Sequence, residues 1–297
     1  MSLVIAESLD EALAEVAAGA RPIAGGTDLV VASRQGTVPL PESLVAIDRL
    51  IELSGLSGGD DGVRIGAVVT HARLMTDATI VDQYTALADS AALVGSPSTR
   101  NVGTLGGNVM NASPAMDTGA PLLVLDATAE LHSSSGSRQV ILSDLWIGPG
   151  ATSASADELC VALQLPPRKP LSGSAYVRLE YRRAMEIAVV GAAASITLDA
   201  DGMVIEGRVA LTAVAPTIIE VDKLDLAATT PAVAAARAAT AARLSARPIS
   251  DIRASDTYRS HVIGVMAARA VDAAARRAAG ETIAVPVNRA TGIGAAR

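Results

Sequence analysis

Hydrophobic and polar positions repeat with a helical period near the N-terminus and with strand-like runs after it. Ser8 and Glu11 form the pattern of a capping box ahead of an amphipathic segment that stops at Gly19. The elements expected in this part are a helix over 9–18, strands over 21–25 and 43–48, and a short helix over 29–35. We therefore expect a compact α/β unit over residues 1–55.

The middle of the chain combines strands, helices and a hairpin. TAELHS and RQVILSDL alternate polar and apolar residues on either side of SSGS, which is typical of a β-hairpin. Thr70 precedes a helical pattern and is expected to cap it. The other elements expected here are a strand over 62–70, helices up to about Val94, a glycine-rich loop over 95–127 and a strand over 158–166. The proline-rich segment 166–170 predicts a linker.

Three strands and two alanine-rich helices are expected in the last part of the chain. The strands cover 174–183, 188–200 and 203–214, with the turn DADG between the last two, and the helices cover 231–245 and 257–279. Strands that occur in hairpins as well as between helices favour an α+β fold. We expect domains at 1–55, 56–170 and 174–285, and a tail at 286–297 that has little to pack against.

Composition narrows the possible classes of function. No apolar run approaches the roughly 18 residues that cross a bilayer, and acidic residues interrupt the first segment, so a cytoplasmic location is expected. A net charge of -7 and 2% aromatic residues argue against a nucleic-acid-binding face. Cys160 is the only cysteine, so the thiols of this chain cannot form an internal disulfide or ligate an iron-sulfur cluster. We expect no metal site.

Two glycine-rich segments carry the candidate chemistry. The first, AGGTD at 24–28, ends a strand and leads into a helix, an arrangement that offers clustered backbone N–H groups to a pyrophosphate. A simple turn would use the same glycines, and the segment matches neither GxGxxG nor GxxxxGK[ST]. Taken alone, it leaves both interpretations open.

The second segment, within 95–127, places glycines beside well-spaced polar residues. Gly106 and Gly107 would let a ligand approach the backbone, Thr104 and Asn108 would bind phosphate or hydroxyl oxygens, and Asp117 would accept hydrogen bonds from sugar hydroxyls. Two such segments imply one extended ligand. The alternative is a rigid Ω-loop held by its own side chains.

AGGTDLVV and GTLGGNVMNASPAMD resemble the two flavin-binding signatures of the FAD subunit in the xanthine dehydrogenase and carbon monoxide dehydrogenase family of molybdenum hydroxylases. IGAVVTHARL, IGPG, ELCVALQLP and SAYVRLEYRRAMEIAVVGAAASI also resemble family landmarks, so the resemblance covers about residues 1–285. It implies a vanillyl-alcohol-oxidase-like (PCMH-type) FAD-binding domain of two α/β subdomains with FAD extended between them. A C-terminal domain of antiparallel strands and helices is expected to follow.

The resemblance also implies a set of FAD-binding residues. They are Ile23, Ala24, Gly25, Gly26, Thr27, Asp28, Leu29, Val94, Gly95, Thr104, Gly106, Gly107, Asn108, Asp117, Leu163 and Arg178. Arg178 stands where the family usually has lysine near the flavin, and a permanent cation there would stabilise the reduced anionic form. Glu186 stands where the family commonly has aspartate. A bond from Glu186 to Arg182 or Arg183 is an equal alternative to flavin contact.

The function implied by the resemblance is that of an oxidoreductase subunit without catalytic residues of its own. FAD in this chain would receive electrons from two 2Fe-2S clusters of a small partner subunit and pass them to an external acceptor. A large partner subunit would hold molybdopterin and the substrate, in a dimer of heterotrimers. The branch that reduces hydroxybenzoyl-CoA needs further cysteines on this subunit and is excluded.

A self-contained FAD-dependent oxidase or dehydrogenase is the main alternative function, and a scaffold with a decayed flavin site is another. GLSGG at 55–59 matches GxSxG, but a polar loop and a strand follow it where a nucleophile elbow requires a helix. His71, His132 and His261 are too dispersed for a metal site. His71 remains open as a residue near the flavin, with covalent attachment as a further alternative.

Overall fold

The chain forms two compact units in a computed structural model that describes residues 1–36, 38–182 and 184–292. Unit 1 comprises 1–73, 97–112 and 127–167, and unit 2 comprises 74–96, 113–126 and the described residues from 168 onward. Each unit is built from segments that are far apart in sequence. The three-domain division expected at 55 and 170 stays a prediction.

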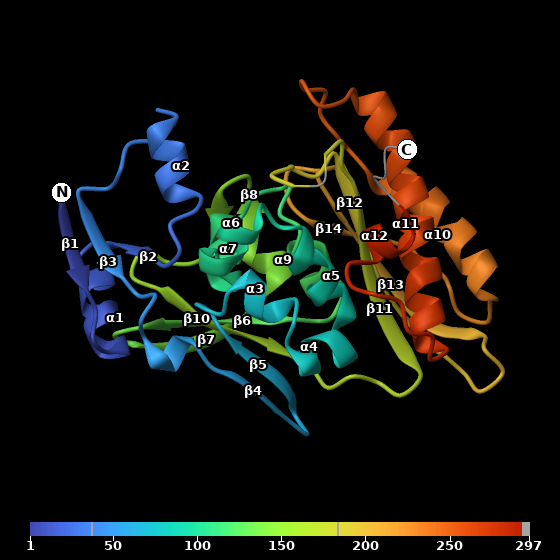
Figure 1. The fold of residues 1–297 in the computed structure, drawn as a ribbon, viewed down its shortest axis with the longest axis horizontal. Helices are drawn as coiled ribbons and strands as arrows, with labels where there is room; N and C mark the ends of the chain where they lie inside the picture. Colours follow the sequence, from blue (N-terminus) through green and yellow to red (C-terminus); the bar gives the residue numbers. More distant parts are fainter. Residues whose placement is uncertain (37, 183, 293–297) are drawn as a thin grey trace. The chain divides into compact units, whose positions relative to one another are not determined.

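Unit 1 contains a parallel sheet and an antiparallel sheet (Figure 1). The parallel sheet has the order β1 (Ser2–Ile5), β3 (Ser43–Ala46), β2 (Arg21–Ile23). The antiparallel sheet has the order β4 (Leu56–Gly59), β5 (Gly62–Gly66), β10 (Leu159–Leu165), β6 (Thr128–Ser133), β7 (Gly136–Ile141). A separate two-stranded sheet pairs β8 (Trp146–Gly148) with β9 (Ala151–Thr152). The predicted hairpin is the pair β6 and β7. The strands β1, β4, β8 and β9 were not predicted.

Helix α1 (Leu9–Ala17) begins after a capping residue, Ser8, and buries one apolar face. The Ser8 hydroxyl accepts a hydrogen bond from the Glu11 N–H at 3.2 Å, and Gly19 ends the segment with φ +95°. Leu13 and Val16 are buried in a core that includes Val45 of β3. The predicted helix and its Ser8 cap are confirmed, whereas the Glu11 carboxylate accepts from the Glu7 N–H at 2.7 Å and not from Ser8 as a full capping box requires.

The sequence patterns predicted only some of the bounds of the other short helices. They are α2 (Leu29–Arg34), η1 (Ile51–Leu53), α3 (His71–Leu74), α4 (Ala78–Gln83), α5 (Thr85–Leu93), α6 (Pro97–Val102), α7 (Leu105–Asn111), α8 (Gly119–Val124), α9 (Leu142–Leu145) and α12 (Val287–Ala290). The predicted cap of α3 is confirmed, because the Thr70 hydroxyl accepts from the Arg73 N–H at 3.3 Å.

The expectation of one long loop over 95–127 is wrong, because α6, α7 and α8 lie within it. Glycine, serine and asparagine have low helix propensity, so these helices depend on contacts from outside. In α7 the Leu105 N–H donates to Val69 O and the Gly106 N–H donates to Ala67 O, each at 2.9 Å. These contacts, which the local sequence does not contain, hold α7 in place.

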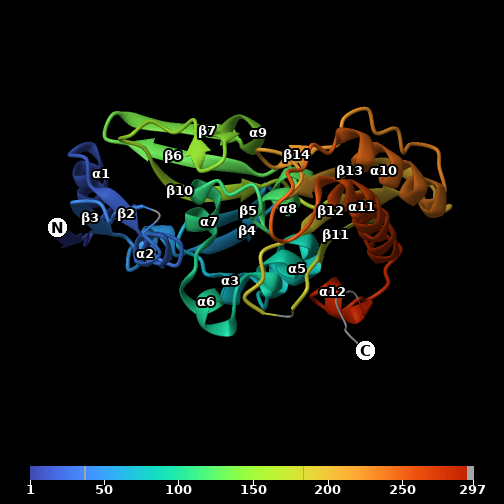
Figure 2. The same ribbon diagram turned by 90° about the horizontal axis from the view of Figure 1, so that it is seen from above.

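Unit 2 is built on an antiparallel sheet with the order β11 (Ser172–Leu179), β12 (Val190–Leu198), β13 (Val204–Thr212), β14 (Ile219–Glu220). Helix α11 (Asp256–Ala278) packs along β11 and β12, with α10 (Pro231–Ser245) beside it (Figures 1 and 2). Along β11 the side chains alternate between two faces. Gly173 lies against Ala274 of α11, whereas the Ser174 hydroxyl accepts from the Ala86 N–H of α5 at 3.1 Å. Both faces of the sheet are therefore covered.

A buried ion pair fixes the last described residues to unit 2. The Arg277 guanidinium meets the Asp89 carboxylate at 2.6 Å, and the same carboxylate accepts from the Val287 N–H at 2.9 Å. Val287 and Asn288 are fully buried. The expectation that this segment has little to pack against is wrong for these two residues. Residues 293–297 of the expected tail lie outside the described part of the chain.

Candidate cofactor-binding site

The two glycine-rich turns meet inside unit 1. A Cβ atom on Gly25 would lie 1.8 Å from the carbonyl oxygen of Val102, and one on Gly103 would lie 3.4 Å from the hydroxyl oxygen of Thr27. Contacts this close place the two backbones side by side. The predicted convergence of the two segments is confirmed.

Gly25 and Gly26 are needed for different reasons. Gly25 is the point of close approach, where any side chain would collide with the backbone at Val102. Gly26 has φ +64°, a left-handed conformation that residues with a Cβ atom adopt at a cost. The pair therefore sets both the contact between the turns and the direction in which the chain enters α2.

The first turn presents a row of unused backbone donors. Within the described part of the chain, no N–H from Gly25 to Leu29 donates a hydrogen bond, and bonding resumes with the Val30 N–H to Gly26 O at 2.9 Å. Asp28 stands at the N-cap of α2, but its side chain makes no capping bond. Successive free N–H groups in a turn form an anion-binding concavity, and diphosphate oxygens are suitable acceptors. The geometry fits the diphosphate of a dinucleotide.

The second turn uses its backbone donors internally. The Gly103 N–H donates to Thr99 O at 2.7 Å and the Gly107 N–H donates to the Thr104 hydroxyl at 3.2 Å. A Cβ atom on Gly106 would lie 2.6 Å from that of Ala67, so this glycine permits close packing within the unit. The contribution of this turn to ligand binding therefore falls to side chains. The predicted roles of Thr104, Gly106, Gly107 and Asn108 stay predictions.

His71 lies where the two turns meet. Its backbone N–H donates to Gly103 O at 3.1 Å. Its ring carbon Cδ2 lies 3.4 Å from the position that a Gly103 side chain would occupy. Burial, and then the nearby Arg100 cation, lower the pKa of the imidazole to about 4. The ring is neutral at pH 7. Its buried Nδ1 atom has no hydrogen-bond partner among the described residues.

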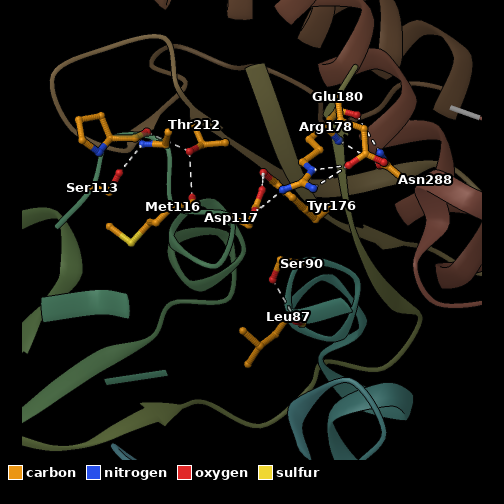
Figure 3. A network of polar contacts seen from close by, with 12 residues as sticks. Leu87, Ser90, Ser113, Met116, Asp117, Tyr176, Arg178, Glu180, Thr212 and Asn288 are labelled. Atoms are coloured by element: carbon orange, nitrogen blue, oxygen red, sulfur yellow. Dashed lines mark hydrogen bonds and ion pairs between the residues drawn. The ribbon is translucent and has the colours of Figure 1, made fainter. Parts of the chain in front are cut away.

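The remaining polar residues of the predicted set lie in unit 2, in the network shown in Figure 3. Asp117 accepts from the Tyr176 hydroxyl at 2.7 Å and from Nη1 of Arg178 at 2.6 Å. Nε and Nη2 of Arg178 donate to Glu180 at 2.9 and 2.6 Å. The Asn288 side-chain amide bonds both backbone groups of Arg178, at 3.0 and 2.8 Å.

The Arg178 cation is balanced by its own neighbours. Burial alone would lower the pKa of the guanidinium, but Asp117, Tyr176 and Glu180 outweigh it and raise this pKa. Burial raises the pKa of Asp117, with Arg178 acting in the opposite direction. Two carboxylates therefore flank one fully buried guanidinium, and they offset the positive charge that was expected to act on the flavin. The flavin-binding roles of Asp117 and Arg178 stay predictions.

Sequence reasoning missed Tyr176, Glu180 and Asn288 as members of this network. A signal for the first two was present, because Ser174, Tyr176, Arg178 and Glu180 alternate with small apolar residues and so share one face of a strand. Asn288 carried no such signal. Its contact with Arg178 joins residues 110 positions apart in the sequence.

The other predicted residues have less direct positions. Ile23 and Ala24 lead into the first turn and Leu29 follows it, whereas Val94 and Gly95 follow α5 in unit 2. Leu163 lies in β10 between Ile65 and Ala129 and has no exposed area. Glu186 forms an ion pair with Arg182 at 3.3 Å, which is one of the alternatives expected for it. Arg183 lies outside the described residues.

The described residues contain no group of three or more His, Cys, Asp or Glu side chains that could hold a metal ion. They also contain no helix that is both long and apolar enough to cross a membrane. Cys160 is buried, and burial raises the pKa of its thiol to about 12. It is a small core residue of β10.

A turn whose N–H groups have no acceptor among the described residues, packed against a second glycine turn, is typical of sites that bind a phosphate-containing ligand. Residues 1–168 match the family of the FAD binding domain in molybdopterin dehydrogenase, and residues 175–274 match the carbon monoxide dehydrogenase flavoprotein C-terminal domain. This chain belongs to the family of FAD-binding subunits of molybdenum hydroxylases. The resemblance and the α+β fold inferred from the sequence are confirmed.

Similar proteins include named subunits of dehydrogenases. The chain is 33% identical over 270 residues to the xanthine dehydrogenase FAD-binding subunit of Escherichia coli O157:H7, which covers 88% of this chain and 91% of that one. It is 31% identical over 275 residues to the carbon monoxide dehydrogenase medium chain of Afipia carboxidovorans, covering 90% and 92%. A structure of carbon monoxide dehydrogenase from Hydrogenophaga pseudoflava matches with a TM-score of 0.88 and 28% identity, covering 93% and 98%.

Proposed function

We propose that this chain is the FAD-carrying electron-transfer subunit of a molybdopterin and iron-sulfur hydroxylase or dehydrogenase. The observation that carries the proposal is the row of N–H donors from Gly25 to Leu29 that have no acceptor among the described residues, in a chain that belongs to an FAD-binding family. FAD, when bound, supplies the capacity to take up electrons singly and release them in pairs. The protein supplies binding, orientation and electrostatic tuning.

The residues of unit 1 have separable tasks in this proposal. The donors from Gly25 to Leu29 bind the diphosphate, and the contact between Gly25 and Val102 keeps them in place. The Thr104 hydroxyl already accepts from Gly107, so its own hydrogen remains available for an oxygen of the ligand. Rigid positioning of these groups before binding reduces the entropy cost of holding an extended ligand.

The partners proposed for this subunit follow from the family. They are a large subunit that binds molybdopterin and a small subunit that carries two 2Fe-2S clusters, in a dimer of heterotrimers in the cytoplasm. Support comes from relatives whose names describe subunits of larger enzymes, such as the alpha subunit of the 6-hydroxypseudooxynicotine dehydrogenase complex of Paenarthrobacter nicotinovorans, 32% identical over 285 residues. In such an assembly the substrate pocket lies in another polypeptide.

Spectroscopy of the chain with and without its partners tests the proposal. The chain is isolated alone and as the assembly that co-purifies with it, and the absorbance of bound flavin is followed after substrate is added without oxygen. We expect substrate to bleach the flavin in the assembly and to leave it unchanged in the isolated chain. Bleaching in the isolated chain would instead support a self-contained oxidase or dehydrogenase. A colourless chain that does not take up FAD would contradict both.

A further inference from the structure

Helix α7 carries the second glycine-rich segment, and one side of it is anchored within unit 1. Leu105, Gly106 and Val109 are buried, and they share one face of the helix because residues three and four positions apart are neighbours. The first turn is fixed by hydrogen bonds to the segment at 67–69. The other side of the helix, which includes Asn108, is at least partly exposed.

The last turn of α7 is held by the hairpin of β8 and β9, which lies beside it (Figure 1). The indole Nε1–H of Trp146 donates to Val109 O at 3.0 Å, and the Gly150 N–H donates to Ala112 O at 3.0 Å. Val109 O also accepts from the N–H of Ala112, which ends the helix with φ +48°. Trp146 is buried, so its N–H needs an acceptor inside the protein, and this carbonyl provides it.

Helix α7 depends on such contacts because its own sequence favours a helix only weakly. Its seven residues, LGGNVMN, include two glycines and two asparagines, and helices this short are marginal without tertiary contacts. The bonds at its first and last turns therefore determine where its middle lies. Asn108 directly precedes Val109, so the bond from Trp146 to Val109 O restricts the movement of Asn108.

We propose that Trp146 is a positioning residue for FAD binding, whose indole N–H holds α7 so that the Asn108 side chain meets the ligand. This inference rests on the proposed function and adds to it a residue outside both glycine-rich segments. Trp146 acts through Val109 O and the helix backbone, without contact to FAD. An indole N–H can only donate, and Trp146 has one such group, so the bond to Val109 O uses its full hydrogen-bonding capacity.

The N–H of Trp146 can be removed almost alone, because the chain contains one tryptophan. The chain is produced with a tryptophan analogue that has sulfur in place of the indole N–H, which keeps the shape of the ring and changes only this position. Trp146→Phe removes the same N–H genetically. Val16→Ala, in the core under α1, is the control for lowered stability alone. Urea unfolding of each apoprotein measures stability, and quenching of flavin fluorescence measures FAD affinity.

We expect the sulfur analogue and Trp146→Phe to bind FAD about three- to tenfold more weakly, as loss of one hydrogen bond predicts. Val16→Ala should lower the urea midpoint and bind FAD as the unmodified chain does. Unchanged affinity in the folded sulfur analogue would overturn the inference. An equal loss of affinity in Val16→Ala would also overturn it, because lowered stability alone would then explain the effect.

A double-mutant cycle tests whether Trp146 acts through Asn108. Asn108→Ala alone should weaken FAD binding, and removing the Trp146 N–H as well should add little, because the contact that Trp146 positions is already lost. The sulfur analogue replaces Trp146→Phe in the cycle if that variant does not fold. Additive losses would overturn the inference, and so would unchanged affinity in Asn108→Ala. Failure of the unmodified chain to bind FAD would instead contradict the proposed function, so the two failures are distinguishable.

Discussion

Gly25→Ala tests whether the contact between the two glycine turns organises the site. The added Cβ would lie 1.8 Å from Val102 O, while ordinary contact begins at 3.4 Å, so the backbone there must move by about 1.6 Å. Overpacking against backbone costs about 1–3 kcal/mol. The displacement would also disturb the N–H groups that face the ligand. We expect both the stability and the FAD affinity of the chain to fall.

Gly55→Ala is the matched control, because it is the same chemical change at a glycine with no atom within 4 Å of the new Cβ. Urea unfolding of the apoproteins measures stability, and fluorescence titration measures FAD affinity. Gly55→Ala should change the free energy of unfolding by less than about 0.5 kcal/mol. Gly25→Ala should lower it by about 1–3 kcal/mol and weaken FAD binding by about tenfold or more. Equal behaviour of the two variants would refute the reasoning.

Three other predictions concern buried ionisable side chains. Arg277→Met leaves Asp89 buried without its cation, so urea unfolding should show a loss of about 3–5 kcal/mol, whereas Arg276→Met at the exposed neighbouring position should change little. The pKa of His71 falls from 6.5 to about 4 on folding, so the unfolded chain binds the proton first as the pH is lowered. The free energy of unfolding should therefore drop by about 3 kcal/mol between pH 7 and pH 4. The drop should be smaller in His71→Leu. Arg178→Ala should lower the reduction potential of bound FAD if the cation acts on it, and an unchanged potential in a variant that keeps its FAD would exclude that role.

Local patterns predicted most of the regular elements because those elements depend on local interactions. The helix α1 follows from its Ser8 cap and apolar face, and the β6 and β7 hairpin follows from alternation around a turn. The strands β11, β12 and β13 were predicted for the same reason. Strand β1 was missed because its four residues form a strand only by pairing with β3, which lies about 40 residues further along.

The two turns of the site could be predicted because glycine occurs where the backbone needs a positive φ or a close approach. AGGTD and GTLGGN identified the two turns, and their contact in unit 1 agrees with that interpretation. Sequence could not show that, among the described residues, the N–H groups of the first turn lack acceptors while those of the second donate to Thr99 and to the segment at 67–69. It also could not show that Arg178 is paired with two carboxylates, one of which is 61 residues away.

Hydrogen exchange at residues 25–29 tests the central claim most directly. In the apoprotein these N–H groups have no acceptor among the described residues, so they should exchange with deuterium at nearly the rate of an unfolded peptide. Saturating FAD should slow their exchange strongly, while the exchange of exposed residues at 57–61 should stay the same. Bound FAD that leaves the exchange at 25–29 unchanged would contradict the claim that this turn holds the diphosphate.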